Sequence, residues 1–270
     1  MKSSIESFNK AKLYSTKGES YFSSYDDILS SYIYLNQPIV FVEIGVRDGG
    51  GLEMWKDYLP DGSRIIGIDN NPAAKNFESD QYEIFIGDQA DEKFWSDFFL
   101  KVGNVDIILD DGGHTNMQQL KTLLSTINYI NDGGMLIIED THASYLPAFS
   151  NPSNYSFIRY VYNLVDRINY RYEPLSSKNN YLDLPIYKIS FFESICVLYK
   201  DIKKSNVSKI IDNGGTSMDY EDFRDKSETI DKLKVRFAYL KYIPLVKTLV
   251  LYFIGKKNRL ENIKMKKYFK

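Results

Sequence analysis

The chain has 270 residues, of which 43% are hydrophobic and 26% charged, as in an ordinary globular protein. Its formal net charge is only −2, which favours neither nucleic acid nor acidic ligands as partners. The single cysteine, Cys196, excludes a disulfide framework, and the polar residues Met1–Lys10 lack the apolar core of a secretory signal. We therefore expect a cytoplasmic protein that does not bind nucleic acid.

Short β-branched runs alternate with longer helix-compatible stretches, the pattern of βαβ units around a parallel sheet. The predicted strands are Ile39–Ile44, Arg64–Ile68, Glu83–Ile86, Val105–Leu109 and Met135–Glu139. The predicted helices are Leu52–Tyr58, Glu92–Leu100, Met117–Tyr129 and Ser156–Tyr170. Two strand-like runs then follow each other closely, at Ile186–Phe192 and Ser194–Tyr199. The predicted fold is a Rossmann-like, doubly wound, mostly parallel α/β sheet that ends in an antiparallel hairpin, the usual finish of class I methyltransferases that use S-adenosylmethionine (SAM).

Composition divides the chain into four predicted parts: a helical segment on the substrate side (1–36), the α/β domain (37–200), a linker (201–231) and a basic extension (232–270). The extension holds twelve Lys/Arg and one acid, Glu261. Within it Phe237–Ile254 is apolar, but Lys241, Pro244 and Lys247 interrupt it, which argues against a spanning helix. Two interpretations stay open: an amphipathic helix on an anionic membrane surface, or a segment packed on its own domain or on a second subunit.

A glycine-rich loop follows the first predicted strand and opens a helix, where free backbone N–H groups can approach a ligand. It contains Gly45 and Gly49–Gly51. A nicotinamide-binding motif needs glycine where this chain has Arg47. Glu43, two residues before Gly45, instead suits a ligand with an ammonium group, such as the methionine end of SAM. A tight turn without a ligand is the alternative.

Three other acidic residues are predicted to contact the cofactor. Asp69 closes the second strand, where a carboxylate can accept both ribose hydroxyls of SAM or of NAD. Asp88, after the third strand, is expected near an adenine amine. Asp110, at the end of the fourth strand, is the last predicted cofactor residue, and capping of a helix is the alternative for it.

Acidic residues also end the fourth and fifth strands, which are neighbours in this fold. We therefore expect Asp111, Glu139 and Asp140 to meet at the carboxyl edge of the sheet. Three carboxylates so close repel one another unless a positive charge lies between them, and Mg²⁺ (or Mn²⁺) is the simplest such charge. His114, three residues after Asp111, is placed to reach a substrate hydroxyl held on that ion. The alternatives are a helix cap for Asp140 and a turn for His114.

Four segments of the sequence resemble the macrocin and mycinamicin sugar O-methyltransferases, which use SAM and Mg²⁺. These segments are Val42–Trp55, Gly87–Asp91, Leu109–His114 and Glu139–Tyr145. A Thr-Asp-Lys type element of these enzymes appears here as Ser15-Thr16-Lys17. The resemblance implies that Asp111, Glu139 and Asp140 bind the metal and that His114 is the general base. It also implies a sugar hydroxyl, on a nucleotide sugar or a glycan, as the acceptor.

Two alternative functions stay open. The chain also resembles cephalosporin hydroxylase-like proteins over the same glycine loop and acidic pairs. A redox iron, however, favours a site of two histidines and one carboxylate, and this chain has only two histidines in all. A non-catalytic SAM-binding scaffold is expected to have lost the base or a metal ligand, and all four residues are present. A divalent-metal-dependent O-methyltransferase is therefore the preferred prediction.

Overall fold

The computed structural model describes residues 2–149, 154–176, 183–216, 263 and 265–268. The chain forms two compact units, Met1–Ile211 and Asp212–Lys270. The first unit contains the whole sheet and also the first residues of the predicted linker. The predicted membrane-interface segment, Phe237–Ile254, lies outside the described residues. Among the residues that are described, no helix is both long enough and apolar enough to cross a membrane.

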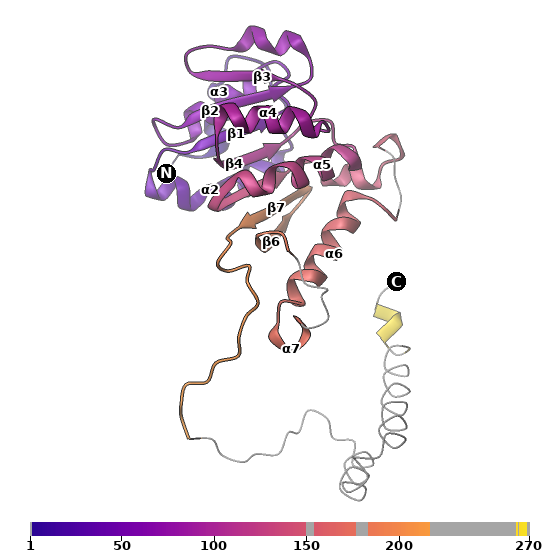
Figure 1. Ribbon diagram of the computed structural model, residues 1–270. Coiled ribbons are helices and arrows are strands. Elements are labelled where there is room, and N and C mark those ends of the chain that lie inside the picture. Colours follow the sequence, from indigo (N-terminus) through magenta and orange to yellow (C-terminus); the bar gives the residue numbers. More distant parts are fainter. Residues whose placement is uncertain (1, 150–153, 177–182, 217–262, 264, 269–270) are drawn as a thin grey trace, which may run out of the picture. The chain divides into compact units, whose positions relative to one another are not determined.

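Seven strands form one sheet in the order β3-β2-β1-β4-β5-β7-β6. Figure 1 shows β3 at one edge of this sheet and β6 at the other. The strands are β1 Val40–Ile44, β2 Arg64–Asp69, β3 Tyr82–Ile86, β4 Val105–Asp110, β5 Ile130–Ile138, β6 Ile186–Phe192 and β7 Ile195–Lys200. β1 to β5 are parallel, and β7 pairs antiparallel with both β5 and β6. This arrangement confirms the predicted doubly wound sheet with a closing hairpin. The strand order reverses between β1 and β4, and ligands of such sheets bind outside the carboxyl ends of the strands at that point.

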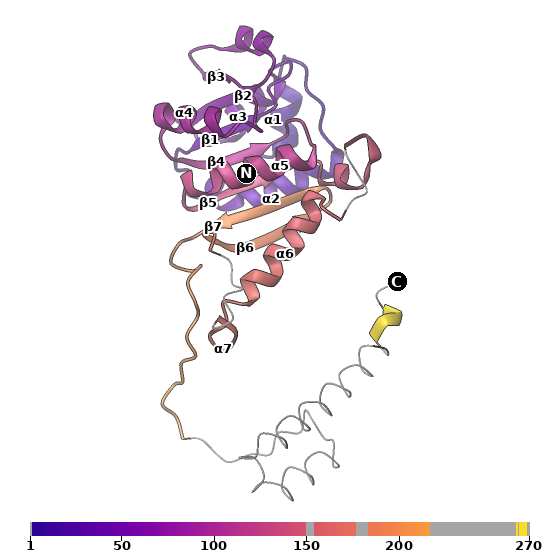
Figure 2. The same ribbon diagram turned by 45° about the vertical axis from the view of Figure 1, so that its right-hand side comes forward.

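Helices cover both faces of the sheet (Figure 2). On one face lie α1 Ser4–Lys10, α2 Glu19–Leu35 and α3 Gly50–Tyr58; on the other lie α4 Glu92–Val102, α5 Asn116–Thr126 and α6 Phe157–Asn169, followed by α7 Glu173–Ser176. Short 3₁₀ turns occupy Pro72–Phe77, Ile127–Tyr129, Thr141–Tyr145, Pro147–Phe149 and Lys266–Tyr268. Each face has its own apolar core, as expected for parallel strands that are buried on both sides.

Two predicted boundaries differ from the structure near β5. The strand begins at Ile130, five residues before the predicted start, because Ile130 pairs with Val105 on β4. Gly133, with a φ of +89°, lies at the irregular part of β5 that separates this pairing from the regular ladder beginning at Met135. The preceding helix α5 ends at Thr126, and a 3₁₀ turn replaces its predicted last turn.

Alternation along the central strands decides which side chains share a face. Phe41 on β1 and Ile137 on β5 belong to the core beneath α2 and α3. Two residues further along each strand come Glu43 and Glu139, which therefore point to the same face. Asp110, at the end of β4, has the opposite parity and faces the α4 and α5 side. Strand parity therefore places Glu43 and Glu139 on the face covered by α2 and α3, and Asp110 on the face covered by α4 and α5.

Candidate active site

A cavity of about 340 Å³ opens at the carboxyl ends of the central strands. It is bounded by the glycine loop after β1, the ends of β2 and β3, the loop after β4, and residues 14–16 of the N-terminal segment. Seven of the nine predicted site residues line it: Glu43, Gly45, Asp69, Asp88, Asp111, His114 and Asp140. The fold thus gathers these seven residues, from five separate stretches of sequence, around one space.

The glycine loop leaves room at the cavity floor that a larger residue would fill. Gly45 has a φ of +99°, and a Cβ there would lie 2.1 Å from the carbonyl oxygen of Asp111. A Cβ on Gly51 would lie 2.5 Å from Oε1 of Glu43. Only glycine therefore allows β1, the loop and the end of β4 to approach so closely.

Glu43 has one carboxylate oxygen without a partner. Its Oε1 accepts a hydrogen bond from Nε1 of Trp55 at 3.0 Å, whereas Oε2 is buried and receives no hydrogen bond from any described residue. A buried acceptor left unpaired is costly. An ammonium group entering the cavity would supply the missing donor, so Glu43 fits the role predicted for it.

The two other carboxylates predicted to contact the cofactor, Asp69 and Asp88, are held by backbone amides. Asp69 accepts from the N–H of Arg47 at 2.9 Å on Oδ2 and from the N–H of Asn71 at 2.8 Å on Oδ1. Asp88 accepts from the N–H of Ala90 at 2.8 Å. Each carboxylate oxygen has a second lone pair, so both residues are fixed in place and still able to accept hydroxyl or amine donors from a ligand.

Asp110 lies behind the cavity wall. Asp110 is only 1% exposed. Both of its carboxylate oxygens accept a hydrogen bond from Nε2 of Gln89, at 2.9 and 3.0 Å. Gln89 lines the cavity, and its Oε1 accepts from the N–H of Gly113 at 2.8 Å. Asp110 is not among the described residues that line the cavity, so nothing in its placement supports the predicted direct contact with a cofactor. Asp110 instead orients Gln89 and, through it, the loop that carries His114.

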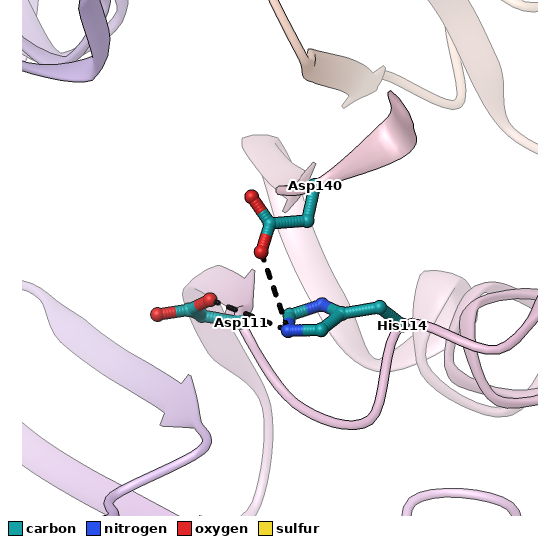
Figure 3. A group of neighbouring side chains, drawn as sticks. All are labelled: Asp111, His114 and Asp140. Atoms are coloured by element: carbon teal, nitrogen blue, oxygen red, sulfur yellow. Dashed lines mark ion pairs between the residues drawn. The ribbon is translucent and has the colours of Figure 1, made fainter. Parts of the chain in front are cut away.

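Three of the side chains that line the cavity converge on one another: Asp111, His114 and Asp140 (Figure 3). Each offers one ligand atom, and these atoms all lie within 4.8 Å of one another. Nε2 of His114 is 3.3 Å from Oδ2 of Asp140 and 4.0 Å from Oδ1 of Asp111. His114 and Asp140 have φ values of +56° and +51°, which are uncommon outside glycine and often mark functional residues. This donor set is suited to a divalent cation.

Glu139 is separated from that group. Its buried carboxylate accepts from the hydroxyl of Tyr25 and, at 3.0 Å, from Nζ of Lys17. The same Nζ lies 2.6 Å from Oδ2 of Asp111 and 3.8 Å from Oε1 of Glu43. The positive charge that crowded carboxylates require is therefore already present as the ammonium of Lys17. In this structure Asp111 and Asp140 face the cavity, as expected for metal ligands, whereas Glu139 faces Lys17.

Burial changes the proton affinity of this cluster. Burial alone would lower the pKa of Lys17, but Glu139 and its neighbours outweigh that effect and raise it well above its ordinary value. Burial raises the pKa of Glu139 to about 8 and that of Glu43 to about 7, with Lys17 opposing both shifts. Burial thus disfavours the charged form of both carboxyl groups, and the Lys17 ammonium favours it.

We expect the metal-free protein to lose stability as the pH rises from about 5 to about 8. The pKa of Glu139 is higher in the folded state than its unfolded value of about 4.5, so the folded state binds more protons in this window, and the free energy of unfolding falls as they leave. The two pKa values correspond to a loss of roughly 3 kcal/mol over this window. Urea unfolding in EDTA at several pH values measures it. Glu139→Gln should flatten the slope, and an equal slope in both proteins would contradict the assignment.

The sequence pointed to Lys17 only through the resemblance of Ser15-Thr16-Lys17 to a Thr-Asp-Lys element, and it assigned no role in the site to Lys17, Tyr21 or Tyr25. Tyr21 donates a hydrogen bond to Asp140, and Tyr25 donates one to Glu139, both from α2. Lys17 precedes α2 by two residues. The spacing of Tyr21 and Tyr25 places both on one helix face, a signal that the sequence contains. Nothing local indicates that this face covers the ends of β4 and β5.

Comparison with known proteins defines the class of fold. No protein-family model matches the chain. The solved structure of the MycE methyltransferase from the mycinamycin biosynthetic pathway, a complex with Mg and SAH, matches 79% of this chain and 58% of its own, with a TM-score of 0.68 and 22% sequence identity. The chain has the class I methyltransferase fold, as predicted.

Curated relatives are O-methyltransferases of the predicted type. Mycinamicin VI 2''-O-methyltransferase of Micromonospora griseorubida is 30% identical over 128 residues, 45% of this chain and 32% of the relative. The 2'-O-methyltransferase of Streptomyces olivaceus that acts on 8-demethyl-8-α-L-rhamnosyl tetracenomycin-C is 30% identical over 123 residues, 43% of this chain and 32% of the relative. The predicted resemblance is confirmed. The matched region is about a third of the length of these relatives.

Proposed function

We propose that the chain transfers a methyl group from SAM to a sugar hydroxyl, with Mg²⁺ or Mn²⁺ in the site. One observation carries this proposal: a single cavity joins the unpaired Oε2 of Glu43 and the carboxylate of Asp69 to the group formed by Asp111, His114 and Asp140. The first two residues suit the ammonium and ribose of SAM. The relatives named above support the reaction, and the rhamnosyl substrate named for one of them supports a sugar as the acceptor.

The converging donor atoms fit a divalent cation. Asp111 and Asp140 offer carboxylate oxygens, and His114 adds a ring nitrogen close to both. We propose that Asp111 and Asp140 hold the ion and that Glu139 completes the ligand set. When bound, the cation would supply Lewis-acid activation of the acceptor hydroxyl, and SAM would supply the methyl group.

His114 is the residue of this chain that we propose to move the proton. Its Nε2 edge faces Asp111 and Asp140, so a hydroxyl held beside these carboxylates lies within reach of the ring. The ring of Phe149 packs edge-on against His114, with 6.2 Å between centroids, and limits its movement. A histidine suits this role because its ordinary pKa lies near neutral pH. Tyr21 holds Asp140 in place by a hydrogen bond.

The alternative of a hydroxylase-like iron site is less well supported. The converging group contains one histidine and two carboxylates, the reverse of the ligand set typical of such iron enzymes. Nδ1 of His142 lies 4.0 Å from Asp140 and 3.1 Å from Oγ of Ser194, and His142 does not line the cavity formed by the described residues.

Incubation with SAM, Mg²⁺ and a panel of nucleotide sugars and glycosides tests the proposed function. We expect SAH release that depends on the acceptor, with one added methyl group on the sugar by mass spectrometry. Binding of SAM without SAH release on any acceptor would instead support the scaffold alternative.

Asp69→Ala is expected to weaken SAH binding by about ten- to a hundredfold, because a charged acceptor of the ribose hydroxyls is lost. Isothermal titration calorimetry measures the change, and Mn²⁺ affinity should stay as in the wild type. Asp80→Ala, which removes an exposed carboxylate that does not line the cavity, is the matched control. Equal SAH affinity of Asp69→Ala and the wild type would remove Asp69 from the cofactor site.

A further inference from the structure

Lys17 is a buried cation in the middle of the site. Its side chain is 2% exposed, and its ammonium group contacts carboxylates from three different strand ends. The distances from Nζ are 2.6 Å to Asp111, 3.0 Å to Glu139 and 3.8 Å to Glu43. The ammonium also lies 5.9 Å from the centre of the Tyr25 ring. No other lysine or arginine of the described residues forms an ion pair with these three carboxylates.

The segment that carries Lys17 is anchored to the sheet domain. Glu53 on α3 accepts hydrogen bonds from the N–H groups of Lys12 and Leu13, at 2.6 and 2.8 Å. The carbonyl of Tyr14 accepts from the N–H of Gly50 at 3.3 Å. These contacts fix the backbone just before Lys17, so the ammonium is held in position as part of the fold.

Lys17 and a divalent cation need the same carboxylates. Oδ2 of Asp111 contacts Lys17, while Oδ1 of Asp111 faces His114 at 4.0 Å, on the side where the ligand atoms converge. Glu139 directs one oxygen to Lys17 and the other to Tyr25. An ion bound by Asp111 and Glu139 would therefore lie close to the ammonium, and the two positive charges would repel.

We propose that Lys17 is a built-in counter-ion that holds the carboxylate cluster together in the metal-free protein and competes with the divalent cation for Asp111 and Glu139. When the metal binds, its positive charge then replaces that of the Lys17 ammonium beside the carboxylates. Metal affinity therefore depends on the N-terminal segment that carries Lys17 as well as on the ligands. This inference rests on the proposed function, because it assumes that the cation binds at these residues. Lys17 acts as a positioning residue, through the carboxylates that it holds.

Thermal unfolding in EDTA tests the counter-ion role without any metal. Lys17→Met keeps most of the side-chain volume but leaves buried carboxylates uncompensated, so the melting temperature should fall by about 10 °C. Adding Glu139→Gln removes one of those negative charges and should recover at least half of the loss. If Lys17 mattered only through packing, the second substitution would give no recovery, and the proposal would be overturned.

Mn²⁺ titration followed by electron paramagnetic resonance tests the competition. Lys17→Met should bind Mn²⁺ at least about tenfold more tightly than the wild type, because a neighbouring positive charge is gone. Lys12→Met, which removes an exposed lysine of the same segment, should bind as the wild type does. Unchanged or weaker Mn²⁺ binding by Lys17→Met, or no binding by either protein, would overturn the proposal.

Asp140→Asn separates failure of this inference from failure of the proposed function. Asp140 makes no ion pair with Lys17 but belongs to the converging ligand group. If this substitution leaves Mn²⁺ affinity unchanged, the proposed metal site is wrong. If it weakens Mn²⁺ binding while Lys17→Met does not strengthen it, the metal site stands and the competition by Lys17 is wrong.

Discussion

Methyl transfer is expected to fall by about a thousandfold or more when divalent cations are removed with EDTA, and millimolar Mg²⁺ or Mn²⁺ should restore it. The reason is the group of ligand atoms on Asp111, His114 and Asp140, which lie within 4.8 Å of one another in the cavity lining. In this structure Lys17 contacts the carboxylate of Asp111, and Tyr21 donates a hydrogen bond to that of Asp140. The measurement is SAH release under single-turnover conditions, before and after dialysis against EDTA.

Two controls show that this loss reflects the metal. SAH affinity should remain within about threefold of its original value in EDTA, because Glu43 and Asp69 do not belong to the converging group. Asp140→Asn should reproduce the loss at saturating Mg²⁺, whereas Asp61→Asn, at a turn remote from the cavity lining, should not. Full turnover in metal-free buffer would show that the carboxylates serve another purpose.

Replacing His114 is expected to lower turnover by about 10²–10⁴-fold, the usual contribution of a general base. His114→Asn is the preferred variant, because the residue has a φ of +56° and asparagine tolerates this conformation better than alanine does. His142→Asn is the matched control, since His142 is the other histidine of the chain and does not line the cavity. Turnover with a saturating acceptor gives the comparison.

The same variant decides between two roles for His114. If His114 acts only as a base, His114→Asn should leave the affinities for SAH and Mn²⁺ unchanged. As a metal ligand, which its 3.3 Å distance from Asp140 also allows, its loss should lower Mn²⁺ affinity by tenfold or more. A collapse of SAH affinity instead would show that His114 maintains the loop after β4, where Thr115 begins α5 with a capping box.

The sequence by itself determined the sheet and the location of the site. Runs such as Val105–Leu109 are apolar throughout because parallel strands are buried on both faces, and glycine or acidic residues interrupt them where the strands end. The positions of Glu43, Asp69, Asp111 and Asp140 at those ends followed from the chain order, since parallel strands bring their carboxyl ends to one edge. The resemblance to sugar O-methyltransferases added the chemistry expected there.

Strand parity could also have been read from the sequence. Asp110 and Asp111 are adjacent, so their side chains point to opposite faces of the sheet, and both cannot line one cavity from the same face. This alternation argues against the predicted contact of Asp110 with the cofactor. The structure shows Asp110 bonded to Gln89, on the α4 and α5 side.

Only the tertiary structure decided which positive charge lies among the carboxylates. Lys17 is 94 residues from Asp111 and 122 from Glu139, and no local pattern relates them. The contact exists because α1 and the segment after it pack along α3, which carries Lys17 over the ends of β1, β4 and β5. Electrostatics required a cation somewhere in this cluster, and that much could be predicted from the acidic residues alone. The identity of that cation depended on long-range packing, which brings Lys17 from the N-terminal segment next to the carboxylates.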